Sequence, residues 1–198
     1  MISMDYTGLI NEYIALEIET LNRLPTAAIN DLINELDAAR KRDGTIYIMG
    51  NGGSGATASH FVNDFNKGVS EWIDQKFRFV CLNDNVSTIM AVANDISYDA
   101  IFEFQLRGKV TANDLVIGLS GSGNSKNVLN AIELAKSVGA KTVGLTGYDG
   151  GKLKSMVDLS VHVPVMSMQV TEDIHMVFDH LIMSVFYKVL CGKDHLRR

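Results

Sequence analysis

From residue 45 onward the chain alternates between short runs of consecutive apolar residues and longer segments in which apolar residues recur every three or four positions. Unbroken apolar runs are typical of strands that are buried on both faces of a sheet, and the longer period is typical of amphipathic helices. The apolar runs predict strands at residues 45–49, 77–82, 114–119, 141–146 and 159–163. The alternation predicts an α/β fold with a doubly wound five-stranded parallel sheet, for which we expect the flavodoxin-like strand order.

Toward both ends of the chain the apolar spacing predicts helices and no strands. It predicts a pair of N-terminal helices before residue 43, with Pro25 in the first turn of the second helix. It also predicts a last helix from about residue 171 to 190, with Thr171 as the N-cap and two acidic residues in the first turn. This last helix is apolar around much of its circumference, so it packs either between subunits of a homo-oligomer or inside one subunit.

The composition fits one globular domain, residues 1–198, and argues against several classes of function. The formal net charge is −5 and there is no long basic run, which disfavours nucleic-acid binding. No apolar run approaches the roughly 20 residues of a membrane span, and no signal peptide is evident. Cys81 and Cys191 each lie in an apolar run, which predicts buried free thiols in a reducing cytoplasm. Disorder is expected only in residues 194–198.

A loop in which hydroxyls alternate with glycines joins the third predicted strand to a helix. Its residues are Ser120, Gly121, Ser122, Gly123, Asn124 and Ser125. The glycines let backbone N–H groups approach an anion, and the serine hydroxyls and the free N–H groups of a helix start can donate hydrogen bonds to phosphate oxygens. Such a loop can also be a simple turn, but the alternation favours a phosphate cradle. It contains no lysine, unlike a P-loop.

A second glycine-rich loop, containing Asn51, Gly52, Gly53 and Ser54, follows the first predicted strand. Both loops fall at the carboxyl ends of strands, where open parallel sheets bind their ligands. Asp95, at the end of a predicted helix, could contact a sugar hydroxyl or cap that helix. Two such loops beside candidate acid and base residues indicate chemistry on a phosphorylated sugar.

The helix after the second loop carries His60 and Asp64, four positions apart. Residues with this spacing share a helix face, so they can bind one metal ion or share one substrate proton, although many exposed pairs of this kind are only solvated. The last helix carries Glu172 and His180, which differ by about 80° around the helix axis and converge only if Glu172 lies at a frayed end. His175 competes with His180 for a catalytic role.

In order and spacing, these segments resemble the phosphoheptose isomerases (sedoheptulose 7-phosphate isomerases) of the sugar isomerase (SIS) family. The resemblance rests on residues 50–54, 58–61, 93–95, 120–125, 145–151 and 173–180 and extends to about residue 190. It implies a flavodoxin-like SIS domain with its α/β core at residues 44–190 and N-terminal helices, 1–43, used in oligomerisation. It further implies a cytoplasmic homotetramer that converts sedoheptulose 7-phosphate into D-glycero-D-manno-heptose 7-phosphate for lipopolysaccharide or capsule.

The resemblance also implies one zinc ion per subunit, bound by His60, Asp64, Glu172 and His180. Aspartate stands at position 64 where the family usually has glutamate, and glutamate stands at position 172 where glutamine is usual. In the implied reaction a proton moves between C1 and C2 of the open-chain sugar through an enediol. Asp64 acts as the base, His180 as its partner and zinc as the Lewis acid.

Substrate contacts are implied at the same motifs. Besides the 120–125 loop, which would fix the phosphate, the implied contacts are Asn51, Gly52, Gly53, Ser54, Asp95 and Glu172. Asn51, Ser54 and Asp95 would orient the sugar hydroxyls. Two alternatives stay open: a binding or adaptor protein of the same fold, such as a partner of a replication initiator, and an isomerase of another phosphosugar.

Overall fold

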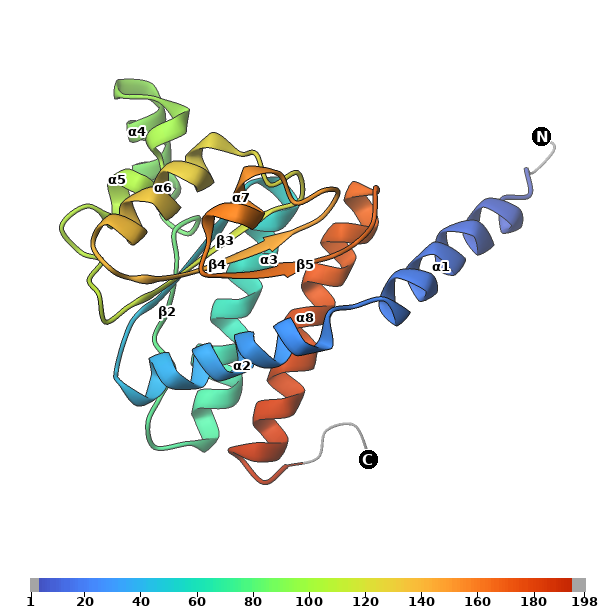
Figure 1. The fold of residues 1–198 in the computed structure, drawn as a ribbon, viewed down its shortest axis with the longest axis horizontal. Helices are drawn as coiled ribbons and strands as arrows, with labels where there is room; N and C mark the ends of the chain where they lie inside the picture. Colours follow the sequence, from blue (N-terminus) through green and yellow to red (C-terminus); the bar gives the residue numbers. More distant parts are fainter. Residues whose placement is uncertain (1–3, 194–198) are drawn as a thin grey trace.

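The computed structural model describes residues 4–193, so the expected disorder of residues 194–198 lies outside the described residues. Its centre is a five-stranded parallel sheet with the strand order β2-β1-β3-β4-β5 (Figure 1). The strands are β1 (Ile46–Gly50), β2 (Phe79–Cys81), β3 (Leu115–Ser120), β4 (Lys141–Thr146) and β5 (Leu159–His162). This order is the flavodoxin-like one, which confirms the predicted fold class.

Helices precede, connect and follow the strands. The α-helices are α1 (Thr7–Asn22), α2 (Thr26–Lys41), α3 (Gly52–Asn63), α4 (Val86–Asp95), α5 (Glu103–Leu106), α6 (Lys126–Ser137), α7 (Gly151–Met156) and α8 (Met168–Val189). A π-helix, Asp64–Val69, continues α3, and short 3₁₀ helices lie at Ser70–Trp72 and Tyr98–Ala100. None of the helices within residues 4–193 is long and apolar enough to cross a membrane.

Both faces of the sheet are covered, which is why its strands read as unbroken apolar runs. Successive residues of β1 point to opposite faces: Ile46 and Ile48 pack into a core with α2, α3 and α8, whereas Tyr47 and Met49 pack into a core with α5 and α6. The same alternation continues in β3. Because β1 and β3 are parallel neighbours with Gly50 opposite Leu119, the loops after them lie at the same edge of the sheet, at its carboxyl end.

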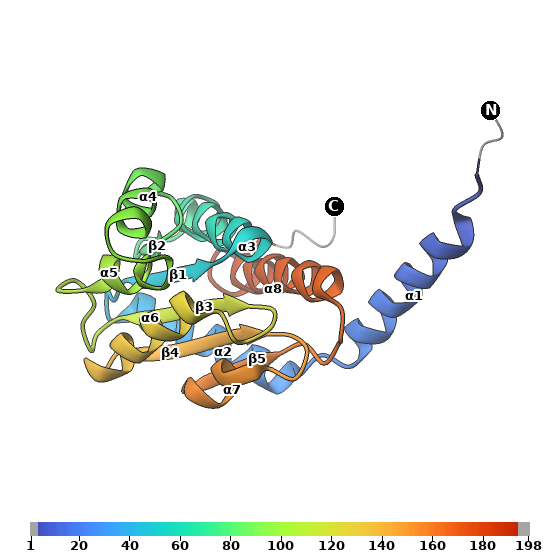
Figure 2. The ribbon, with the colours of Figure 1, turned by 90° about the horizontal axis from the view of Figure 1, so that it is seen from above.

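The two N-terminal helices are present, but they pack differently. The apolar face of α2 is buried under the sheet, whereas α1 projects away from the rest of the chain (Figures 1 and 2). Side chains of α1 such as Leu9 and Ile10 are more than half exposed. Contacts with α8 tie α1 to the body, among them a hydrogen bond that the Tyr13 hydroxyl donates to Asp173.

The last helix begins earlier than its sequence predicts. Its N-cap is Ser167, whose Oγ accepts a hydrogen bond from the Val170 N–H at 3.4 Å, so Thr171 as the N-cap is wrong. Thr171 is buried, and its hydroxyl donates to the Ser167 carbonyl instead. Glu172 therefore lies in the second turn of α8, in regular helix rather than at a frayed end.

The two thiols differ in burial. Cys81 is buried, as predicted, whereas Cys191 is only partly buried, and both are free.

Candidate functional site

Helices α3 and α8 lie side by side and run in the same direction, because each begins beyond the carboxyl end of a strand (Figure 1). A Cβ atom built on Gly53, at the start of α3, would lie 2.4 Å from Oε2 of Glu172 near the start of α8. Further along, a Cβ atom built on Gly68 would likewise come too close to the side chain of Met183 on α8. This pair of helices carries most of the polar residues that the sequence singles out.

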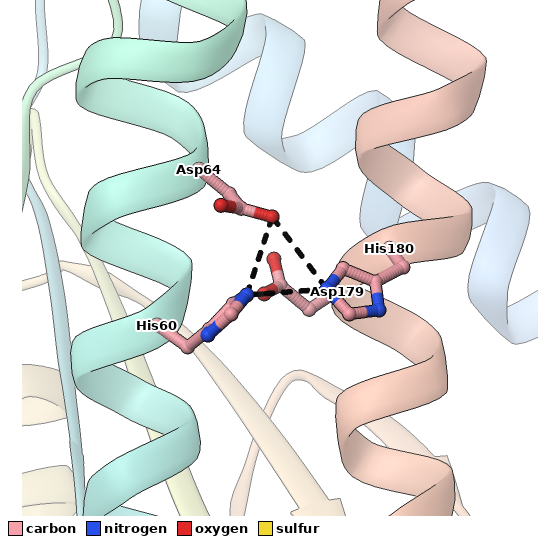
Figure 3. Close-up of side chains that lie close together, drawn as sticks. All are labelled: His60, Asp64, Asp179 and His180. Carbon is pink, nitrogen blue, oxygen red and sulfur yellow. Dashed lines mark hydrogen bonds and ion pairs between the residues drawn. The ribbon is translucent and has the colours of Figure 1, made fainter. Parts of the chain in front are cut away.

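Four ionisable side chains meet between the two helices, and we call them the His–Asp group: His60 and Asp64 from the α3 side, and Asp179 and His180 from α8 (Figure 3). The Nε2 atoms of the two histidines are 3.1 Å apart. Asp64 Oδ2 lies 3.5 Å from Nε2 of His60 and 3.8 Å from Nε2 of His180. Asp179 Oδ2 lies 3.7 Å from Nε2 of His60. The expected meeting of His60, Asp64 and His180 is thus present in a single chain.

The helix changes its winding where Asp64 stands. Regular α-helix ends at Asn63 and the π-helix begins at Asp64. Such wider turns occur frequently at functional sites, because they change the direction of a side chain without breaking the helix. The Asn63 amide donates to Oδ1 of Asp64 at 2.9 Å, which leaves Oδ2 facing the two histidines.

The His–Asp group carries an uncompensated buried acid. Asp179 is completely buried, and neither of its carboxylate oxygens has a hydrogen-bond partner. Burial, with a further contribution from the charge of Asp64, raises the pKa of Asp179 to about 8. A divalent cation among these donors would offset the cost of the buried charge.

A cavity of about 260 Å³ opens at the carboxyl end of the sheet, where the two glycine-rich loops meet. Its lining residues are Asn51, Gly52, Gly53, Ser54, Leu119, Ser120, Gly121, Ser122, Ser125, Met168 and Glu172. The hydroxyls of Ser120 and Ser125 lie 3.0 Å apart. Gly123 holds the loop shape with a φ of +65°, and a Cβ atom there would lie 1.9 Å from the Gly150 carbonyl oxygen. The expected phosphate loop and the second loop therefore share one cavity.

Glu172 lies in this cavity and is not a member of the His–Asp group. Its carboxylate rests against Gly53 at the N-terminus of α3, where free N–H groups and the helix dipole favour negative charge. Glu172 stands in regular helix eight residues before His180, about 12 Å along the axis, so it lies at the cavity and not in the group. Asp179 occupies the group instead. Its signal in the sequence is a charged residue inside an otherwise apolar helical stretch.

Of the other residues expected to contact the substrate, some line the cavity and some do not. The side-chain amides of Asn51 and Asn127 bond to each other reciprocally at 2.9 and 2.8 Å, and the Tyr98 hydroxyl donates to Asn51, which fixes Asn51 at the cavity wall. Nothing in the sequence predicts that Asn127 pairs with Asn51. Asn124 bridges the loop to α7 by accepting from the Lys152 N–H at 3.2 Å, and Asp95 is exposed at the end of α4. Neither lines the cavity.

His175 is buried completely within α8 and lies outside the His–Asp group. Burial lowers its pKa from 6.5 to about 4. The unfolded chain takes up this proton near pH 6.5, so the stability that neutral His175 confers is present above pH 6.5 and is lost as the pH falls toward 4. Between pH 7 and pH 5 we expect the wild type to lose about 2 kcal/mol more free energy of unfolding than His175→Gln. Urea denaturation at the two pH values measures this, and equal losses would contradict it.

The cavity and the His–Asp group are separated along the helices by about two turns. Gly53 and Glu172 line the cavity, and His60 and Asp179 come seven residues later on their respective helices, about 10 Å along the axis. An extended chain advances about 1.2 Å per bond, so the path from C1 to the phosphorus of a heptose 7-phosphate also spans about 10 Å. The arrangement can thus hold a phosphate at one end and transfer protons at the other.

Known proteins share both the sequence and the fold. The SIS domain family matches residues 11–147. The phosphoheptose isomerase of Aliarcobacter butzleri is 35% identical over 174 residues, 88% of this chain and 89% of that protein. That of Leptospira biflexa is 34% identical over 186 residues, 90% of this chain and 95% of that protein. The structure of phosphoheptose isomerase from Neisseria gonorrhoeae matches with a TM-score of 0.86 and 26% identity, covering 93% of this chain and 100% of the other.

Proposed function

Because the chain belongs to the phosphoheptose isomerases of the SIS domain family, we propose that it converts sedoheptulose 7-phosphate into D-glycero-D-manno-heptose 7-phosphate. One observation carries the proposal for this chain. A cavity lined by serine hydroxyls and glycines and a group of two histidines and two carboxylates lie on the same pair of helices. The Gly53–Glu172 wall of the cavity is about 10 Å along the helix axes from the group, a distance that one extended heptose phosphate can span.

In this proposal the substrate phosphate binds to the 120–125 loop. The hydroxyls of Ser120, Ser122 and Ser125 donate hydrogen bonds to it, with Gly121 and Asn124 shaping the loop. A phosphate bound away from the reacting carbons contributes binding energy that positions C1 and C2.

The sugar hydroxyls are assigned to the other wall of the cavity. Asn51, Gly52, Gly53, Ser54 and Glu172 line this wall and offer both donors and acceptors. Asp95 stays a proposed sugar contact that a second subunit would supply, because in its own chain it does not line the cavity.

The His–Asp group is assigned the proton transfers. Asp64 removes the proton from C1 of the open-chain ketose, which gives an enediol, and the proton returns at C2 to give the aldose. His180, whose Nε2 lies 3.8 Å from Asp64 Oδ2, exchanges the hydroxyl proton between O1 and O2. Since Asn63 holds the other oxygen of Asp64, the base keeps one fixed direction.

The donor set of this group fits zinc, because imidazole nitrogens and carboxylate oxygens are ligands that zinc accepts. The Asp179 carboxylate also has no hydrogen-bond partner that an ion would displace. His60, Asp64 and His180 would hold the ion. When bound, zinc supplies a Lewis acid that polarises the sugar carbonyl. Glu172, the fourth ligand expected by resemblance, lies in the sugar cavity, so its proposed role is to bind a hydroxyl.

Substrate choice tests the proposal against an isomerase of another phosphosugar. We expect zinc-loaded protein to interconvert the seven-carbon pair, and to process five- and six-carbon ketose phosphates at least about a hundredfold less efficiently, because a shorter chain cannot reach both ends of the site. Preference for a shorter phosphosugar would show that the chain is an isomerase of that sugar instead. Binding of phosphosugars without conversion of any would instead support a binding protein.

Assembly and location are further parts of the proposal. A hollow of about 420 Å³ runs along α8, lined by Val177, His180, Leu181, Ser184, Val185 and Lys188, and the apolar side chains of α1 are exposed. We assign both surfaces to the interfaces of a homotetramer, with residues 1–198 as a single SIS domain. A cytoplasmic location suits the two free thiols.

A charged residue in the hollow should dissociate the assembly. Leu181 is 36% exposed in one chain, and we expect Leu181→Glu to lower the oligomer to dimers or monomers, because a carboxylate cannot be buried unpaired in an interface. Val138→Glu, at a 39% exposed position after α6, is the matched control and should leave the mass unchanged. Light scattering after size exclusion measures both, and an unchanged Leu181→Glu mass would contradict the assignment.

A further inference from the structure

Asp179 differs in its surroundings from the other acids within residues 4–193. Its side chain is completely buried on α8 next to the apolar core residues Phe178 and Ile182. Neither carboxylate oxygen has a hydrogen-bond partner, yet the side chain points into the His–Asp group (Figure 3). A second acid, Asp64, faces it across the group.

Such an arrangement is costly unless a cation accompanies it. A buried ionised carboxylate without partners costs several kcal/mol, and a like charge nearby adds to that cost. Buried polar groups in proteins are almost always satisfied, so an unsatisfied carboxylate that points at two imidazoles needs a reason.

The distances within the group supply that reason. His60 Nε2 lies 3.1 Å from Nε2 of His180, 3.5 Å from Oδ2 of Asp64 and 3.7 Å from Oδ2 of Asp179. Ligands at about 2.0–2.1 Å from a tetrahedral zinc ion lie about 3.4 Å from one another. The four donor atoms all lie within 4.8 Å of one another, so they fit around a single ion with small adjustments.

We infer that Asp179 is a direct ligand of the metal ion, which His60, Asp64, Asp179 and His180 bind together, while Glu172 remains in the sugar cavity. The two carboxylates then balance the charge of a divalent cation, and the buried acid gains its partner. The inference deepens the proposed function and rests on it for the choice of zinc. Its prediction concerns metal binding, which is measured without any sugar.

Two isosteric exchanges on the same helix provide the test. Asp179→Asn and Glu172→Gln each remove one negative charge. We expect Asp179→Asn to weaken zinc binding by about a hundredfold or more in competition with a chromogenic chelator, and Glu172→Gln to change it less than about threefold. The metal-free Asp179→Asn protein should melt no lower than the metal-free wild type, because without the ion the buried carboxyl group has no hydrogen-bond partner to lose.

Cysteine variants report direct coordination. With Co²⁺ in place of zinc, Asp179→Cys should show a new sulfur-to-metal charge-transfer absorption, whereas Glu172→Cys should not. A residue that only supports the fold would not produce this band. If Asp179→Asn does not fold, this pair of cysteine variants and the zinc affinity of Glu172→Gln carry the test.

Either of two results overturns the inference: zinc binding by Asp179→Asn as tight as by the wild type, or loss of zinc affinity and a cobalt–thiolate band at position 172. A failure of the proposed function looks different. In that case the wild type binds zinc through Asp179 but converts no sedoheptulose 7-phosphate.

Discussion

Asp64→Asn should lower kcat for sedoheptulose 7-phosphate by about a thousandfold, with little change in thermal stability. The asparagine keeps the shape of the side chain but cannot take up the C1 proton. His180→Gln should show a loss of similar size, since its Nε2 lies 3.8 Å from the base. Steady-state kinetics measure both variants, with the zinc content of each determined alongside so that loss of the base is distinguished from loss of the ion.

The control for this prediction is Asp64→Glu, which restores the side chain that is usual in the family. We expect it to keep kcat within about tenfold of the wild type, because the carboxylate that takes up the proton is retained. Normal turnover by both Asp64→Asn and His180→Gln would show that other groups transfer the protons.

The second large effect is expected at the phosphate loop. Ser120→Ala and Ser125→Ala each remove a hydroxyl from the cavity wall, and each should lower kcat/KM about 10- to 100-fold, because a hydrogen bond to a charged group contributes about 1.5–3 kcal/mol. The loss should appear in kcat as well as in KM, because the phosphate contacts also position the reacting carbons. Ser137→Ala, at the exposed end of α6, is the matched control and should be neutral. Equal effects of all three exchanges would contradict a phosphate site in this loop.

Much of the fold follows from the hydrophobic pattern alone. The runs that form β3 and β4 are buried on both faces, so they stand out without any knowledge of the tertiary structure. The strand order was expected from the doubly wound class and is confirmed. The packing of α1 was not predictable in the same way, because apolar spacing does not tell whether a partner surface belongs to the same chain.

The candidate site was predictable where residues close in sequence carry it. The four-residue spacing placed His60 and Asp64 on one helix face, and the loop chemistry placed the serines of residues 120–125 in one cavity. Glu172 depended on where α8 starts, and the N-cap at Ser167 moved that start away from Thr171. Asp179 depended on which face of α8 meets α3, which only the packing of the two helices decides.

In the proposed reaction this chain moves a proton between C1 and C2 of sedoheptulose 7-phosphate. The most direct test is to incubate the zinc-loaded protein with this sugar in D₂O and follow the products by NMR. We expect aldoheptose 7-phosphate that carries deuterium at C2, because the enediol exchanges its proton with solvent through Asp64. Asp64→Asn should form it about a thousandfold more slowly. Absence of aldoheptose with the folded, zinc-loaded wild type would contradict the claim.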